Sequence, residues 1–244
     1  MIQYEFPLNE RIRKFLRIEE IFKKMESQVY AKHEFSSYSC FNTFFEIIAF
    51  ASRADLKVEL IQEIEKQRSK MKTKMKTKKN IAINNELYRT RLKLEKSKTT
   101  PGFNFGGDKF LTELKTRAAS PFGIVASDFP EFQYWLKKTS EIDRETYFKN
   151  KLNDFLPIKI AITNLMKILR KNIKNNSIQA NSGTLQYKLD PLLKNDLVII
   201  SLGESSKFYP SISSNKYAVN VHFSKITNET YTKSIKFKIG IASF

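Results

Sequence analysis

The sequence predicts an α+β fold, with a mainly helical domain at residues 7–175 followed by a smaller antiparallel β domain at residues 176–244. Apolar residues recur at helical spacing through most of the first region and at every second position in the other. Of the 244 residues, 41% are hydrophobic, which is enough for one large core or two small ones. Gly and Pro, seven of each, are about half as frequent as usual, and this favours long helices.

The first residues predict a strand and then a long helix. Residues 2–6 alternate weakly and are a candidate short strand, and Pro7 stands where a first helical turn tolerates proline. From Leu8 onward the apolar positions cover one broad helical face. Arg13 and Arg17 are four residues apart, so we expect both on the opposite, polar face of this helix.

A helical hairpin with a strong positive charge is predicted next. Residues 37–52 form a Phe-rich helix, residues 54–79 a second long helix, and residues 81–96 the returning arm. From residue 66 to residue 98 there are 13 Lys or Arg and two Glu, a net charge of +11. A solvated, charged hairpin explains this run, and phosphate binding without sequence preference is the alternative.

The middle of the chain alternates loops with short elements. Residues 99–108 hold three of the seven Gly and predict a loop. Asp108 is a suitable N-cap for a helix that runs to about Ala119. Residues 122–127 are a candidate strand, and a short helix starts near Pro130.

The last third changes from helical spacing to alternation. Residues 142–174 are predicted to be helical, with Pro157 starting a new segment or kinking the helix. Alternating segments follow at 185–189, 197–199, 217–223 and 235–241. They predict an antiparallel sheet with one exposed face, and the strands near 2–6 and 122–127 are candidates to join it.

The net charge points to a binding function. Lys and Arg number 43 and Asp and Glu 25, giving +18, which implies an anionic partner such as nucleic acid, a lipid surface or an acidic protein. A codon bias toward A and T accounts for part of the lysine excess. The sequence contains no phosphate-binding glycine loop, nucleophile elbow or paired carboxylates. We therefore expect a protein that is not an enzyme, and the family resemblance given below implies that it needs no cofactor.

Cysteine and histidine are too few for a structural metal site. Cys40 is the single cysteine, so an intrachain disulfide is impossible, and only His33 and His222 could join it around zinc. We expect both histidines at the surface and Cys40 in a core. The N-terminal residues lack a signal-peptide core, and no segment is long enough to span a bilayer. A soluble, cytoplasmic protein without stable membrane insertion is expected.

The opening motifs resemble a known family. Pro7-Leu8-Asn9-Glu10, followed by Leu16-Arg17-Ile18-Glu19, is similar to the start of the ZapD family of bacterial cell-division factors. Three further stretches resemble the family in consistent order: residues 56–68, residues 127–136 and residues 209–223.

The resemblance implies a function and a set of residues. ZapD-like proteins are homodimers that bind the C-terminal tail of FtsZ, the tubulin-like protein of the division ring at midcell, and cross-link its protofilaments into bundles. By position, the tail-binding arginine of the family is Arg17, a basic residue falls at Lys109, and a family histidine falls at Gln133. Lysine at 109 loses the bidentate geometry of arginine, and glutamine at 133 loses the cationic option. Arg13, Lys115 and Arg117 are the nearby basic residues that we add to this expected tail site.

An auxiliary electrostatic surface is also expected, at Lys70, Lys72, Lys74, Lys76, Lys78 and Lys79. It would attract the acidic FtsZ surface. The alternative function is nucleic-acid binding by the 66–98 hairpin. Only Tyr88 is aromatic in that segment, and no helix-turn-helix or RNA-binding sheet motif is present, so no specific nucleic acid is expected as a partner.

Overall fold

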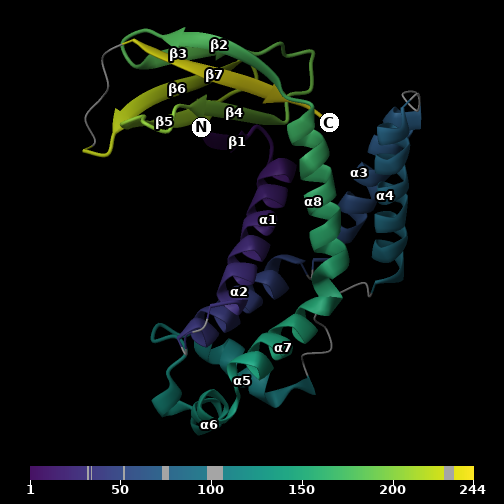
Figure 1. Cartoon of the computed structure of the whole chain (residues 1–244), viewed down its shortest axis with the longest axis vertical. Coiled ribbons are helices and arrows are strands. Elements are labelled where there is room, and N and C mark those ends of the chain that lie inside the picture. The colour runs from purple at the N-terminus through teal and green to yellow at the C-terminus, as the bar shows by residue number, and fades with distance from the viewer. Residues whose placement is uncertain (32, 34, 52, 73–76, 98–106, 228–233) are drawn as a thin grey trace. The chain divides into compact units, whose positions relative to one another are not determined.

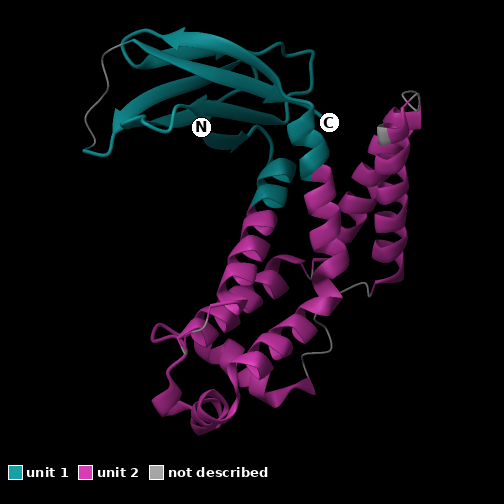
Figure 2. Cartoon of the chain, viewed as in Figure 1, with its two compact units in different colours: residues 1–16, 166–244 teal, residues 17–165 magenta. Residues whose placement is uncertain are grey.

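The computed structural model describes residues 1–244 except 32, 34, 52, 73–76, 98–106 and 228–233. The chain forms two compact units (Figure 2): unit 1 comprises residues 1–16 and 166–244, and unit 2 comprises residues 17–165. The α+β class is confirmed. The division falls inside two helices, and therefore differs from the boundary expected at residue 175.

Unit 1 contains two antiparallel sheets where a single one was expected (Figure 1). The first has the order β1-β4-β7-β2, with strands Ile2–Pro7, Leu197–Leu202, Ile235–Ala242 and Lys174–Ala180. The second has the order β3-β6-β5, with strands Thr184–Lys188, Ala218–Lys225 and Phe208–Ser214. The strands predicted near 185, 197, 217 and 235 are thus confirmed as β3, β4, β6 and β7, while β2 and β5 were not predicted as strands.

The core of unit 1 uses alternate residues of both sheets. Phe223 of β6 is fully buried, and its ring lies 5.6 Å from that of Phe208 and 5.0 Å from that of Phe237. Strand β4 departs from alternation, because all six of its residues are buried. A strand buried on both faces is typical of the middle of a covered sheet.

The N-terminal strand is confirmed, but the role expected for Pro7 is wrong. Strand β1 pairs with β4, and Pro7 is its last residue rather than the first of a helix. Helix α1 spans Glu10–Val29, and Asn9 caps it, since its side-chain oxygen accepts the backbone N–H of Ile12 at 3.0 Å. Asparagine is a preferred N-cap because it satisfies a helical N–H that has no partner within the helix.

The strand predicted at residues 122–127 is wrong. Gly123 has a φ of +68°, and Phe122 is 88% exposed, so the chain turns here instead of joining a sheet. Residues Ala126–Asp128 form one 3₁₀ turn that leads into the helix at Pro130. Only Ile124 is buried among residues 121–128, so this apolar segment does not supply the buried face of a strand.

The helices of unit 2 follow the predicted order. After α1 come α2 Ser36–Ala51, α3 Ala54–Lys72, α4 Lys78–Lys96, α5 Lys109–Ala118, α6 Pro130–Lys138, α7 Glu141–Leu152 and α8 Leu156–Lys171. As expected, Asp108 caps α5, and Pro157 lies at the start of a new helix. Most of the loop expected at 99–108 lies outside the described residues.

An aromatic cluster holds the helices of unit 2 together. The ring of Phe41, in α2, lies 5.7 Å from Phe132 and 5.4 Å from Trp135 of α6, and 4.8 Å from Phe148 of α7. Phe41, Phe132 and Phe148 are almost completely buried. Edge-on packing of this kind adds to the stabilisation that burial already gives.

The predicted helical hairpin is confirmed as α3 and α4, which pack side by side (Figure 1). An ion pair links the two helices, since Glu65 of α3 lies 3.2 Å from Arg91 of α4. Within each helix, Glu65 also pairs with Arg68 at 2.7 Å and Arg91 with Glu95 at 2.8 Å. Part of the positive charge of this segment is therefore balanced within the hairpin.

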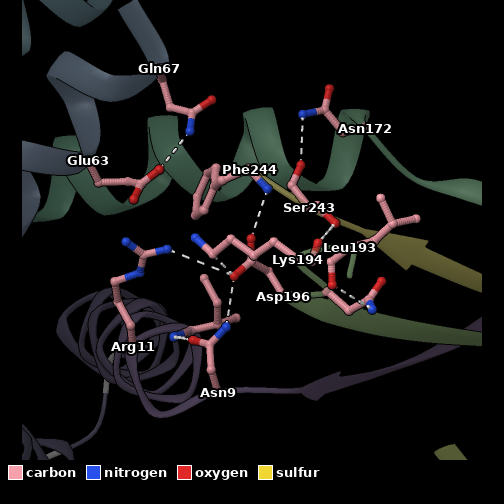
Figure 3. Close-up of polar contacts among 12 residues, drawn as sticks. Asn9, Arg11, Glu63, Gln67, Asn172, Leu193, Lys194, Asp196, Ser243 and Phe244 are labelled. Carbon is pink, nitrogen blue, oxygen red and sulfur yellow. Dashed lines mark hydrogen bonds and ion pairs between the residues drawn. The ribbon is translucent and has the colours of Figure 1, made fainter. Parts of the chain in front are cut away.

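A buried carboxylate ties together the parts of unit 1 (Figure 3). Asp196 is fully buried just before β4. Its oxygens accept the side-chain amide of Asn9 at 2.8 Å and the backbone N–H of Phe244 at 2.9 Å. Arg11 and Lys194 lie 3.8 Å and 3.5 Å away. These contacts fix the first turn of α1 to the β4 strand and to the last residue of the chain.

Candidate functional site

Arg17 lies on the exposed face of α1, as its helical position predicts. Its guanidinium stands 4.9 Å from the ring centre of Phe50 in α2. Arg53, just after α2, approaches the same ring at 6.0 Å. A guanidinium that contacts a ring through its face keeps its N–H donors available at its edge. Two exposed arginines at one ring can therefore receive carboxylates in the bidentate geometry that arginine favours.

Lys109 and Gln133 extend from one aromatic cluster. Both are exposed, Lys109 at the start of α5 and Gln133 in α6. Each is next to an aromatic residue, and the rings of these neighbours, Phe110 and Phe132, lie 6.4 Å apart. Phe110 also stacks on Phe129 at 5.8 Å. The aromatic neighbours of Lys109 and Gln133 therefore belong to one cluster, which joins α5 to α6.

The start of α5 is held by Asp108. Its carboxylate accepts the backbone N–H of Leu111 at 3.1 Å and the ammonium of Lys151 from α7 at 2.9 Å. Burial acts to raise the pKa of Asp108, but the hydrogen bonds from Lys151 and Leu111 outweigh burial and lower the pKa. Because Lys109 is the next residue, this cap also positions the lysine.

The lowered pKa of Asp108 predicts acid sensitivity of α5. The group stabilises the folded state above pH 3.8, its ordinary pKa, and this stabilisation is lost as the pH falls through the lower pKa of the folded state. The protection factor of the Leu111 amide, which is its exchange rate relative to that of an unstructured peptide at the same pH, should fall over that range in the wild type. In Asp108→Asn the protection factor of the same amide should depend much less on pH. Identical pH profiles for the two proteins would contradict the assignment.

The other expected tail-site residues take different positions. Arg117 of α5 is half-buried, with its guanidinium 4.8 Å from the ring centre of Phe129, and Lys115 is exposed on the same helix. Arg13 is exposed, pairs with Glu10 at 3.2 Å and belongs to unit 1. The aromatic cluster thus connects Arg117 with the positions of Lys109 and Gln133.

The expected auxiliary lysines are described only in part. Lys70 and Lys72 of α3 and Lys78 of α4 are exposed near the turn of the hairpin. Lys74, Lys76 and the side chain of Lys79 lie outside the described residues.

Sequence reasoning missed Phe50 and Arg53. Helix α2 contains no Lys or Arg, so Arg53 is an isolated arginine directly after an apolar helix. This isolated position was the signal by which the sequence could have marked Arg53 as a candidate site residue. The partner of Phe50, however, comes from a different helix, and no spacing rule within one segment could have joined it to Arg17.

Cys40, His33 and His222 lie in different environments. Cys40 is buried, which raises the pKa of its thiol to about 12 and keeps it protonated at neutral pH. His33 is exposed as expected, whereas His222 is half-buried instead of fully exposed. Within the described ranges, no three His, Cys, Asp or Glu residues are grouped so that they could hold a metal ion. Of the helices in the described part of the chain, none has both the length and the apolar character that crossing a bilayer requires.

These features define an α+β protein of two units. Its surface carries arginines that contact an aromatic ring, together with exposed polar side chains. The family model for the cell division protein ZapD matches residues 16–222. The chain therefore belongs to the ZapD family of cell division proteins.

Relatives match over nearly the full length. The chain is 32% identical to cell division protein ZapD of Nitrosomonas europaea, covering 100% of this chain and 95% of the relative. It is 30% identical to that of Azoarcus sp. (strain BH72), covering 91% and 90%. It is 29% identical to that of Ralstonia pickettii, covering 100% of both. The family resemblance of the sequence motifs is confirmed.

Proposed function

We propose that this protein acts at the midcell division site in the cytoplasm by binding the C-terminal tail of FtsZ. As a homodimer it would cross-link FtsZ protofilaments into bundles and so stabilise the Z-ring. The observation that carries the proposal is the pair of exposed arginines, Arg17 and Arg53, at the ring of Phe50, in a chain of the ZapD family.

The chemistry of this arginine pair suits a carboxylate-bearing peptide. Each guanidinium can donate two parallel N–H bonds to one carboxylate, and the Phe50 ring supplies apolar surface between them. Lys109 and Gln133 would extend the site. Lys109 would contribute a positive charge, and the side-chain amide of Gln133 would donate a hydrogen bond to a tail carbonyl. The role is binding alone, without catalysis and without a cofactor.

Bundling follows from having two tail sites in one dimer. Each site needs only modest affinity, because a dimer bound by one site holds the other at a high effective concentration near the next filament. A net charge of +18 on each chain would speed encounter with an acidic polymer, while the tail site sets specificity.

The decisive experiment is co-sedimentation with GTP-polymerised FtsZ, intact and tail-deleted, at low and high salt. We expect pelleting and increased light scattering with intact FtsZ only, weakened by salt that screens exposed charges. Equal pelleting with tail-deleted filaments would show that net charge acts alone. No pelleting with either polymer would reject FtsZ as the partner.

The nucleic-acid alternative has weaker support. In the 66–98 hairpin, Arg68 and Arg91 are engaged in ion pairs with Glu65. Tyr88, the aromatic residue that base stacking would need, is already contacted by Arg68 at 4.7 Å. A gel shift with duplex DNA at physiological salt, lost when Lys70, Lys72 and Lys78 are neutralised, would favour this alternative.

A further inference from the structure

One face of the first sheet in unit 1 is hollowed next to its central strands. The hollow has a volume of about 540 Å³ and is lined by residues of β2, β4 and β7 together with Met1 and Gly203. This volume lies within the usual range of small-molecule sites. It uses residues of unit 1 only, and therefore none of Arg17, Arg53, Lys109 or Gln133.

Strand register concentrates donors on this face. Lys238 of β7 is paired with Ser177 of β2 on one side and with Ser201 of β4 on the other. Two residues along β7, Lys236 is paired with Gln179 of β2. Because alternate residues of a strand share a face, the two lysines, the two serines and the glutamine all belong to the hollowed side. We name these five residues the β7 lysine site.

Ser201 is a buried polar residue in this hollow, since it is 5% exposed and is one of the lining residues. Its hydroxyl can donate one hydrogen bond and accept two. A group bound in the hollow would have this hydroxyl as a donor.

The positive charge of the two lysines favours an anionic ligand in the hollow. Lys236 and Lys238 are exposed, and neither lies within ion-pair distance of a carboxylate among the described residues. Glu5 comes from the same sheet, but Arg170 holds it through bonds of 2.6 Å and 2.8 Å. Glu204, near the rim, pairs with the amino group of Met1. The two ammonium groups are thus left to an external ligand.

We propose that the β7 lysine site binds a phosphate group of a small molecule or lipid, of the monoester or diphosphate class. Two ammonium groups match the charge of about −2 that a phosphate monoester carries at neutral pH. Lysine serves as a point charge for phosphate, whereas the planar fork of arginine is better suited to carboxylates. Ser177, Ser201 and Gln179 supply neutral donors for the remaining phosphate oxygens.

Titration calorimetry of the full-length protein with pyrophosphate tests this site. Lys236→Gln with Lys238→Gln should weaken binding about 100-fold, and Ser201→Ala about tenfold, as expected for lost hydrogen bonds to a charged ligand. Lys174→Gln is the control for either lysine substitution made alone, since each of the three removes one positive charge. Lys174 lies in β2 at a position that faces the other side of the sheet, so binding should be unchanged.

Two outcomes would overturn the proposal. One is the absence of pyrophosphate binding at about 1 mM, the weakest affinity expected of a specific site. The other is equal weakening by Lys174→Gln and by Lys236→Gln or Lys238→Gln alone, which would indicate general attraction by the positive chain.

A second assay identifies the source of the phosphate, using phosphatidylcholine vesicles with and without phosphatidic acid. Sedimentation with the vesicles that needs both phosphatidic acid and the two lysines supports a lipid headgroup. Pyrophosphate binding without such sedimentation supports a soluble ligand.

Discussion

Arg17→Glu is expected to abolish co-sedimentation with FtsZ while leaving a folded protein. The substitution removes a guanidinium from the Phe50 ring and places a carboxylate beside the tail. Losing one partner of a charge pair and adding repulsion should raise Kd about 100-fold or more. Folding should be preserved because Arg17 is exposed on α1.

Two further variants separate charge from geometry. Arg17→Lys keeps the charge but loses the bidentate fork, so we expect about tenfold weaker binding. Lys207→Glu makes the same change in net charge at an exposed position of unit 1, and binding should stay near the wild-type value. Wild-type pelleting of a folded Arg17→Glu protein would reject Arg17 as a tail contact.

Asp196→Ala is expected to lower the free energy of unfolding of unit 1 by about 3 kcal/mol, because it leaves buried donors without partners. The donors are the side-chain amide of Asn9 and the backbone N–H of Phe244. Arg11 and Lys194 would also lose the carboxylate beside them. Amide hydrogen exchange in β4 and β7 measures this effect within unit 1.

Asp190→Ala is the matched control for Asp196→Ala. Asp190 is an exposed aspartate in the same connection, and its carboxylate accepts the backbone N–H of Leu192, at 2.9 Å, within its own turn. We expect it to cost about 1 kcal/mol or less. Equal losses in the two variants would mean that the buried network adds nothing beyond a local turn.

The elements that could be predicted are those in which periodicity and burial agree. Helix α1 and strands β6 and β7 bury one face and expose the other, so their apolar spacing is visible in the sequence. Strand β2 could not be found this way. It is polar and mostly exposed, and it is a strand because its backbone pairs with β7 at the edge of the sheet. The strand predicted at residues 122–127 failed for the opposite reason. This stretch is apolar, but a turn at a glycine interrupts it.

The candidate site could be predicted only one helix at a time. The exposure of Arg17 follows from its position opposite the apolar face of α1. Its contact with Phe50 depends on how α1 packs against α2, and no local pattern encodes that packing. The β7 lysine site likewise depends on the strand register between β2, β4 and β7, which alternation within each strand leaves open.

The pairing of β1 with β4 also has a consequence for how the chain is made. Unit 2 is continuous in sequence, so the ribosome completes it before β4 emerges. Strand β1, at Ile2–Pro7, must wait for its partner at Leu197–Leu202. At ordinary rates of translation this delay is roughly 10 to 40 s. During that time a β-strand with unpaired backbone groups is open to wrong pairings. The first sheet of unit 1 can therefore close only after β4 and β7 have left the ribosome.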